Sequence, residues 1–268
     1  MTMALELSIY QVDAFADAVF GGNPAAVVPM RDWLPDPVLQ KIAAENNLSE
    51  TAYLVPDGAG YALRWFTPTT EVELCGHATL ASAAIVFEFL KPASRQVSFT
   101  TRRAGTLQVT QRADGLLEMD FPARPPEPTA TPPGLAGALG AQPREIFAHG
   151  AMTMALFEHE DEVRRLVPDF GALGKVPCGS VIATAPGTEF DFVSRFFGPN
   201  VGIDEDPVTG SAHCLLVPFW ARRLGRKSLT ARQISARGGT IQAEHKGERV
   251  LLAGRTQLYL EGRIFLRN

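Results

Sequence analysis

Residues 75–78, Cys-Gly-His-Ala, open an apolar run from Thr79 to Leu90, and residues 209–212, Thr-Gly-Ser-Ala, open a second from His213 to Leu224. The two openings are offset by 134 positions, half of the 268-residue chain, and their glycines and alanines coincide. A glycine turn before a long, nearly all-apolar segment predicts a buried helix. The spacing therefore indicates that one folding unit occurs twice.

Two more matches support this duplication. The sequence GTLQVTQ at 105–111 matches GTIQAEH at 239–245 with the same offset of 134, and RWFTP at 64–68 matches RFFGP at 195–199 with an offset of 131. Three collinear matches are typical of an internal repeat. The alternative, that strands and helices merely share a composition, stays open because residues 1–50 resemble residues 135–178 only weakly.

Short β-branched or aromatic segments bounded by Gly, Pro or Asp predict strands, and one capped, amphipathic segment after two prolines predicts a helix at Pro37–Asn46. The predicted strands are Ala52–Val55, Ala62–Phe66, Val97–Thr101, Thr106–Gln111, Leu116–Phe121, Val181–Thr184, Phe190–Phe196, Ile241–His245, Val250–Ala253 and Gln257–Leu260.

A proline-rich run at residues 124–133 cannot sustain a helix or a central strand and predicts a linker near the midpoint. We therefore expect an α+β fold with two pseudo-symmetric lobes, an N-terminal lobe of residues 1–124 and a C-terminal lobe of residues 125–268. Each lobe wraps strands around one central apolar helix, and the final strand is allowed to pack on the first lobe. The duplication predicts two buried helix starts that face an active site in the cleft between the lobes.

The composition excludes several classes of protein. Hydrophobic residues make up 46% of the chain and charged residues 20%, which is typical of a globular enzyme rather than a disordered or fibrous chain. The net charge of -4, without a basic stretch, argues against nucleic-acid or membrane partners. Three scattered cysteines, the absence of a secretory signal in Met1–Tyr10 and the absence of a long apolar span predict a protein of the reducing cytoplasm.

The two helix starts predict an anion site. Unpaired backbone N–H groups and the positive end of the helix dipole favour a carboxylate or an enolate-like oxygen, and Gly76 and Gly210 let a ligand approach the backbone. The alternative is that Ser211 is only an N-cap and the glycines only permit tight turns.

Three residues near these turns can move or direct protons. Glu50, at the edge of an apolar strand, is expected to be partly desolvated, with a pKa raised toward that of a general acid/base. His77 is expected to act as a neutral donor or relay, since a helix N-terminus disfavours its cation. Asp206 is expected to orient His77 or a substrate amine. The alternatives are a solvated glutamate, a structural histidine and an acid that shapes a turn.

Cys75 is a further candidate base, because a thiol at a helix start can have a lowered pKa. A symmetric two-thiol mechanism is disfavoured, since Thr209 stands opposite and Cys214 lies five residues on, about 140° around the helix. Within the sequence no dinucleotide or phosphate loop and no metal-ligand spacing occurs, so we expect no metal and no cofactor.

Four ordered motifs carry a resemblance that spans nearly the whole chain. They are VDAF at 12–15 followed by GGNPA at 21–25, NLSET at 47–51, ELCGHAT at 73–79 and EDPVTGSA at 205–212. The chain resembles the PhzF family of phenazine biosynthesis proteins, whose fold is the diaminopimelate epimerase-like duplication. The resemblance implies a cofactor-independent, homodimeric isomerase acting on a small unsaturated or amino-acid-like carboxylate.

By the same resemblance, Glu50 shuttles a proton while His77 and Asp206 assist it. The other motif residues are expected to bind substrate: Ser49, Cys75, Gly76, Thr209, Gly210 and Ser211. The phenazine enzyme itself lacks the thiol of Cys75, and epimerase relatives have a cysteine where this chain has Thr209. Two other hypotheses therefore stay open, a Cys75-dependent amino-acid racemase or epimerase and a non-catalytic protein that binds a small carboxylate.

Overall fold

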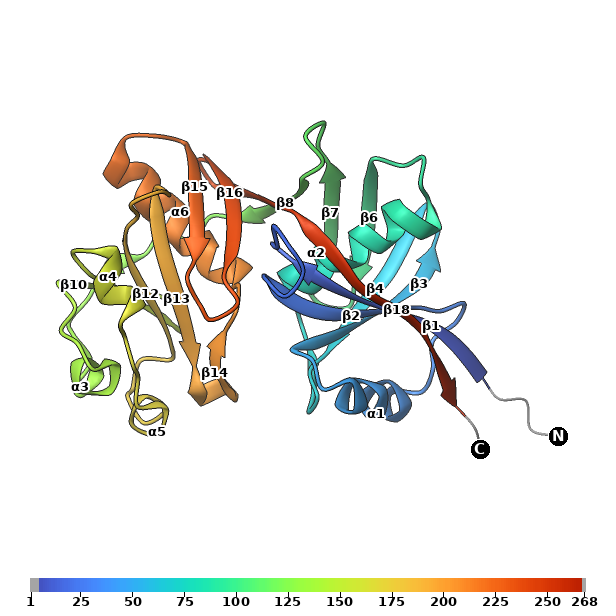
Figure 1. The fold of residues 1–268 in the computed structure, drawn as a ribbon, viewed down its shortest axis with the longest axis horizontal. Helices are drawn as coiled ribbons and strands as arrows, with labels where there is room; N and C mark the ends of the chain where they lie inside the picture. The colour runs from blue at the N-terminus through green and yellow to red at the C-terminus, as the bar shows by residue number, and fades with distance from the viewer. Residues whose placement is uncertain (1–4, 267–268) are drawn as a thin grey trace. The chain divides into compact units, whose positions relative to one another are not determined.

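The computed structural model describes residues 5–266, which form two compact units (Figure 1). One unit contains the described residues up to Asp120 and those from Ala253 onward, and the other runs from Phe121 to Leu252. The division thus falls before the proline-rich run rather than after Arg124, and the C-terminal strand belongs to the first unit.

The first unit is a mixed sheet with two helices. Its helices are α1 (Asp36–Asn46) and α2 (Gly76–Ile85), and α2 continues into a π-helical turn at Val86–Leu90. Its strands are β1 (Leu5–Ala14), β2 (Asn23–Pro29), β3 (Glu50–Asp57), β4 (Gly60–Phe66), β5 (Glu71–Val72), β6 (Gln96–Thr101), β7 (Thr106–Gln111), β8 (Leu117–Pro122) and β18 (Thr256–Leu266).

The second unit has the same kind of sheet and one long helix, α6 (Gly210–Leu224), with three short helices, α3 (Leu135–Leu139), α4 (Glu160–Arg164) and α5 (Phe170–Leu173). A 3-10 turn spans Pro199–Val201. Its strands are β9 (Glu127–Pro128), β10 (Glu145–His149), β11 (Met152–Leu156), β12 (Ser180–Pro186), β13 (Phe192–Gly198), β14 (Ile203–Asp206), β15 (Ser228–Gln233), β16 (Gly239–Lys246) and β17 (Arg249–Gly254).

The strand pairings of the two units are equivalent, which confirms the duplication. In the first unit β1–β2, β3–β4, β4–β5 and β6–β7 are antiparallel, while β2–β3 and β4–β6 are parallel. In the second unit β10–β11, β12–β13, β13–β14 and β15–β16 are antiparallel, while β11–β12 and β13–β15 are parallel. The weakly similar N-terminal segments of the two repeats therefore share a topology rather than a sequence.

In each unit, the first strand of the repeat pairs with a strand that follows the other repeat in the chain. The first strand of the first unit, β1, pairs with β18, which follows β17 of the second repeat. The first strand of the second unit, β10, pairs with β9, which follows β8 of the first repeat. The two-residue β9 lies inside the predicted linker. Its proline is tolerated there because the strand is paired along only one edge.

An arginine cluster recurs at the equivalent place in both units. Arg64 on β4 donates from Nε and Nη2 to Glu71 at 2.7 and 2.8 Å, and Arg195 on β13 donates from the same atoms to Glu205, both at 2.8 Å. Each guanidinium also lies over the phenylalanine two residues later, Phe66 or Phe197. These bidentate contacts assign both arginines to the support of neighbouring strands.

Helices cover both faces of the central strands in the first unit. Nearly every residue of β2 and of β3 up to Val55 is buried, which is typical of strands enclosed on two sides. The apolar helix α2 packs against β1, β2 and β3, while α1 packs its buried Leu39, Ile42 and Ala43 toward β3 and β4 (Figure 1).

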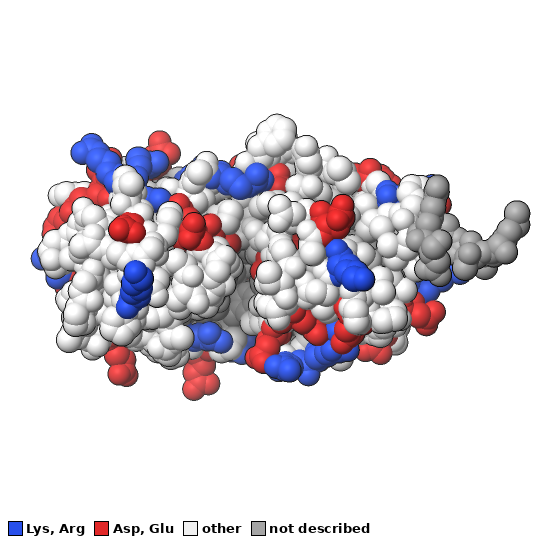
Figure 2. Space-filling view, turned by 90° about the horizontal axis from the view of Figure 1, so that it is seen from below, with Lys and Arg blue, Asp and Glu red and all other residues white. Residues whose placement is uncertain are grey.

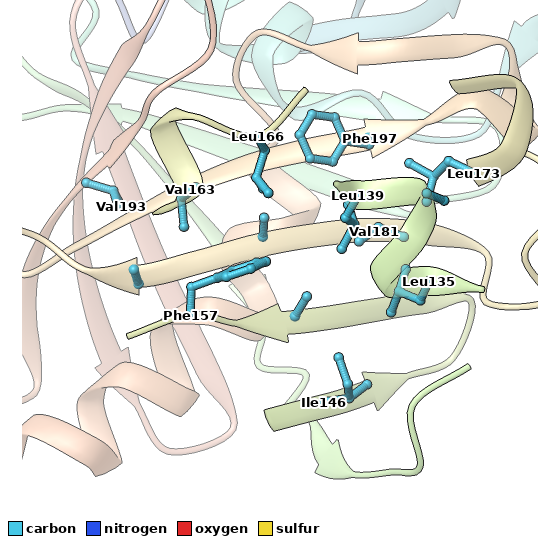
Figure 3. Packing of buried hydrophobic residues seen from close by; sticks show 14 of the residues in the cluster. Leu135, Leu139, Ile146, Phe157, Val163, Leu166, Leu173, Val181, Val193 and Phe197 are labelled. Atoms are coloured by element: carbon cyan, nitrogen blue, oxygen red, sulfur yellow. The ribbon is translucent and has the colours of Figure 1, made fainter. Parts of the chain in front are cut away.

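In the second unit, short helices replace α1. Figure 3 shows Leu135 and Leu139 of α3, Val163 of α4 and Leu173 of α5 gathered over Val181 and the neighbouring strands. These helices were not predicted, because each is five residues or shorter and leaves no helical periodicity. The helix α6 is buried over most of its length, and its Trp220 stacks on Phe192 at 5.7 Å between ring centroids.

Charges of both signs are interspersed on the face drawn in Figure 2, without a broad basic patch. Over residues 5–266 the structure contains no helix with the length and apolar character needed to cross a membrane.

Candidate active site

The ends of three elements of the first unit meet around Glu50. Glu50 is the first residue of β3 and pairs in parallel register with Ala25 of β2, whose first residue is Asn23. Cys75 is the N-cap of α2, and His77 lies in its first turn. Because α2 packs on β2 and β3, its start delivers the thiol and the imidazole to the carboxylate.

The resulting cluster of Glu50, Cys75 and His77 is compact and buried. Nε2 of His77 lies 2.9 Å from Oε2 of Glu50, and Sγ of Cys75 lies 3.5 Å from Nδ1 and 3.9 Å from Nε2 of His77. One ligand-type atom from each residue lies within 4.8 Å of the others. Oε2 of Glu50 is shielded from solvent and receives no hydrogen bond of regular geometry from the described part of the chain, although His77 is at ion-pair distance.

Asn23 and Ser49 hold the other side of the imidazole. The amide of Asn23 lies 3.2 Å from Nδ1 of His77, and the Ser49 hydroxyl lies 3.2 Å from Oδ1 of Asn23. The amide nitrogen donates to a neutral Nδ1, whereas the amide oxygen, after the side chain turns over, accepts from a protonated Nδ1. Because a hydroxyl both donates and accepts, Ser49 satisfies either orientation, and the pair fits both protonation states of His77.

The cluster is electrostatically coupled. Burial acts to raise the pKa of Glu50, but the His77 cation beside it holds that pKa below its usual value. Burial likewise opposes the His77 cation, yet its neighbours Cys75 and Glu50 raise the pKa of His77 well above its usual value. Burial and the Glu50 charge raise the pKa of Cys75 to about 11, so at neutral pH the thiol is uncharged and Glu50 is the partner that stabilises the cation.

Three expectations from the sequence are wrong in sign here. The pKa of Glu50 is lowered rather than raised, the pKa of His77 is raised, which favours the cation rather than the neutral ring, and the pKa of Cys75 is raised rather than lowered. The physical reason is the contact between Glu50 and His77, which are separated by 27 positions in the chain. An opposite charge at 2.9 Å outweighs the partial charge of a helix terminus.

The second unit presents the equivalent helix start. Thr209, the N-cap of α6, donates from Oγ1 to the carboxylate of Asp206, and its backbone N–H donates to Oε1 of Gln233 at 2.9 Å. Gln233 also donates from Nε2 to the backbone oxygen of Asp206 at 2.6 Å. Asp206 is therefore tied to the turn of its own unit.

Sequence reasoning missed Asn23 as a partner of His77 and Gln233 as a partner of Thr209. Gln233 is fully buried at the end of β15. Its polar side chain at a buried position of an alternating strand was the sequence signal that could have marked it as a site residue. Asn23 lies within the GGNPA motif, but its partner is 54 positions away.

The helix starts keep their backbone amides free of side-chain caps. Cys75 and Thr209 both have extended backbone angles, φ -139° and -117°, and neither side chain accepts a hydrogen bond from its helix. Ser211 is thus not the N-cap of α6. A Cβ placed on Gly210 would meet no atom within 4 Å, so packing does not require glycine there.

The predicted site residues fall into two groups by unit. Ser49, Glu50, Cys75, Gly76 and His77 are together in the first unit. The second group consists of Asp206, Thr209, Gly210 and Ser211.

The duplicated fold is shared with a solved epimerase. A hydroxyproline epimerase from Agrobacterium vitis matches with a TM-score of 0.62 over 98% of this chain and 93% of that chain, at 13% identity, a likeness of fold alone. The protein thus belongs to the class of diaminopimelate epimerase-like α+β folds, as the sequence predicted.

The chain belongs to the family of phenazine biosynthesis-like proteins, the PhzF family, whose model matches residues 12–262. A solved PhzF-family protein from Enterococcus faecalis has a TM-score of 0.94 and 44% identity, covering 98% of this chain and 100% of that one. An uncharacterized isomerase of Pseudomonas aeruginosa is 51% identical, covering 98% of this chain and all of the relative. The protein is accordingly an enzyme of the isomerase class.

Proposed function

We propose that the protein is a cofactor-independent isomerase that moves a proton on a small unsaturated or amino-acid-like carboxylate, with Glu50 as the group that removes and returns the proton. The observation that carries this proposal is the state of the Glu50 carboxylate. It is buried, the His77 imidazole at 2.9 Å from its Oε2 holds its pKa below the usual value, and this oxygen has no regular hydrogen-bond donor among the described residues.

The proposed step is balanced within substrate and enzyme. The Glu50 carboxylate takes a proton from carbon, and the electron pair of the broken C–H bond spreads into the conjugated carboxylate of the substrate. Glu50, now neutral, exchanges this proton with solvent and returns one proton to another carbon, so that only the position of the double bond and of the proton changes. No electron acceptor or second substrate is needed.

Charge that develops on the substrate oxygen needs preorganised donors. The uncapped N–H groups at the start of α2 are suited to this role, and His77 keeps Glu50 ionised between turnovers. The helix start at Thr209, Gly210 and Ser211, with Asp206, is proposed to bind the same substrate. The homodimer and the cytoplasmic location stay predictions.

Solvent exchange tests the proposal without knowledge of the product. The protein is incubated in D2O with a panel of small unsaturated and α-amino carboxylates, and deuterium uptake into each ligand is followed by mass spectrometry. Glu50→Gln should abolish uptake while ligand-induced thermal stabilisation persists, and Glu45→Gln, an exposed glutamate on α1, is the matched control. Undiminished uptake in Glu50→Gln would overturn the proposal.

A second candidate function is a Cys75-dependent racemase or epimerase, which the position of the thiol beside His77 favours. The raised pKa of Cys75 makes the thiol a proton donor rather than a base, so it would have to act opposite Glu50. The one-carboxylate isomerase does not need the thiol, so loss of uptake on alkylation or in Cys75→Ser, as well as in Glu50→Gln, would support the racemase or epimerase. Ligand-induced stabilisation with no uptake in any variant would indicate a binding protein.

A further inference from the structure

We propose that Glu50, Cys75 and His77 form a zinc-binding site and that Zn²⁺ bound there blocks the isomerase. Carboxylate oxygen, thiolate sulfur and imidazole nitrogen are the three donor types that zinc takes in proteins. Within residues 5–266 this is the only cluster of three or more such residues whose donor atoms come close enough to share an ion.

The donor spacing is close to what a tetrahedral ion requires. Zinc at its usual distances from sulfur, nitrogen and oxygen separates adjacent donors by about 3.3–3.6 Å. The observed separations are 2.9 Å from His77 Nε2 to Glu50 Oε2 and 3.9 Å from Cys75 Sγ to His77 Nε2. Shifts of about half an ångström bring these two pairs to ligand separations, and all three donor atoms lie within 4.8 Å of one another.

The buried Glu50 carboxylate favours a cation beside it. Its Oε2 has no hydrogen bond of regular geometry from residues 5–266, and its charged neighbour is Nε2 of His77 at 2.9 Å. A cation in the cluster would satisfy it and would replace the positive charge that His77 supplies.

The surroundings of His77 match those of a metal-binding histidine. Such a ring coordinates through one nitrogen and donates the other N–H to a fixed acceptor, which sets the tautomer. The Asn23 amide nitrogen lies 3.2 Å from Nδ1 and the Ser49 hydroxyl donates to the amide oxygen; with the amide turned over, its oxygen accepts the Nδ1–H and the Ser49 hydroxyl accepts from its nitrogen. Nε2 then carries the lone pair on the side of Glu50 and Cys75.

Three protein ligands leave a fourth position for water or a substrate carboxylate. The inhibition follows because zinc occupies the carboxylate that must accept the proton, and this part of the inference rests on the proposed function. Zinc binding itself does not rest on the proposed function, so the zinc site and the isomerase mechanism can be disproved separately.

Cobalt substitution and direct zinc titration test the site. Full-length protein is titrated with Zn²⁺ against a chromophoric chelator, and the Co²⁺ form is examined for the thiolate-to-metal charge-transfer band. We expect one zinc per chain, the band in wild type, and affinity lowered at least about tenfold with the band lost in Cys75→Ser. Serine is a good N-cap, so this variant should fold.

Cys178→Ser is the matched control, because Cys178 is a more exposed thiol outside the cluster and its loss should change neither affinity nor the band. Equal zinc affinity in wild type and Cys75→Ser, or a cobalt form without the thiolate band, would overturn the site. Tight zinc binding in a protein that exchanges no deuterium with any ligand would instead leave the site standing and contradict the isomerase mechanism.

Discussion

His77 and Glu50 form a buried ion pair, with Nε2 of the imidazole 2.9 Å from Oε2 of the carboxylate. The pair joins the first turn of α2 to the first residue of β3 and couples the two titrations. It therefore controls both the protonation of the proposed base and part of the pH dependence of stability.

The first prediction concerns the pKa of His77. Because the Glu50 carboxylate favours the cation, the imidazole should remain protonated above pH 6.5 in the wild type. Glu50→Gln removes that charge, while burial continues to oppose the cation, so the pKa of His77 should fall. NMR of the ring protons measures both values. The internal reference is His213, whose pKa burial lowers to about 4.

The pair also predicts a window of stability. Glu50, with a lowered pKa, stabilises the fold above its unfolded value of 4.5 and loses this contribution as pH falls through its folded pKa. His77, with a raised pKa, contributes fully below 6.5 and loses this as pH rises through its folded pKa. The difference in unfolding free energy between wild type and Glu50→Gln/His77→Gln should therefore peak between pH 4.5 and 6.5. Urea unfolding at several pH values checks it, and a flat difference contradicts the ion pair.

Asn23 is predicted to be a positioning residue. Asn23→Leu keeps the size of the side chain but removes the group that fixes Nδ1 of His77, so turnover should fall by about 10²-fold with KM nearly unchanged. Asn46→Leu is the control, since Asn46 bonds Thr51 and not His77. A purely structural role would lower stability without moving the ring-proton titration of His77, which distinguishes the two explanations.

Gly210 is predicted to be needed for ligand approach and not for folding. A Cβ there meets no atom within 4 Å, so Gly210→Ala should leave the melting temperature unchanged or slightly higher. If the backbone at this helix start binds substrate, KM should rise by about tenfold or more, a loss of about 1.4 kcal/mol. Gly137→Ala in α3 meets the same open space and should change neither quantity. An unchanged KM in Gly210→Ala would remove Gly210 from the site.

Sequence predicted the parts of this fold that carry periodic or repeated signals. The offset of 134 between Gly76 and Gly210 located both central helices, and strands β4, β6, β7 and β16 lie where short β-branched or aromatic segments predicted them. The short helices α3 to α5 and the exchange of β9 and β18 leave no such signal, because they depend on packing and long-range pairing.

The site residues were found by motif, but their charge states were not. A single sequence shows Glu50 at a strand edge and His77 at a helix start, and each environment by itself has a predictable effect on a pKa. The contact between them reverses both effects, and it arises only when α2 packs on β2 and β3. The direction of both pKa shifts is therefore set by a contact across the fold and not by the local sequence around each residue.

The repeated arginine cluster gives the last prediction. Arg195 joins Glu205 through two hydrogen bonds of 2.8 Å and also donates to the backbone oxygen of Leu166 at 2.7 Å, so it ties β14 and the segment after α4 to β13. Arg195→Met should lower the unfolding free energy by about 1.5–3 kcal/mol, the range for hydrogen bonds to charged groups, while turnover at saturating substrate stays unchanged.

Its matched variant is Arg165→Met, because Arg165 bonds Asp161 at an exposed surface and should cost less than about 1 kcal/mol. A double-mutant cycle of Arg195→Met with Glu205→Gln isolates the bidentate contact, since the two changes share one interaction. A coupling energy near zero would contradict the structural role. A large loss of turnover without loss of stability would instead assign Arg195 to substrate binding.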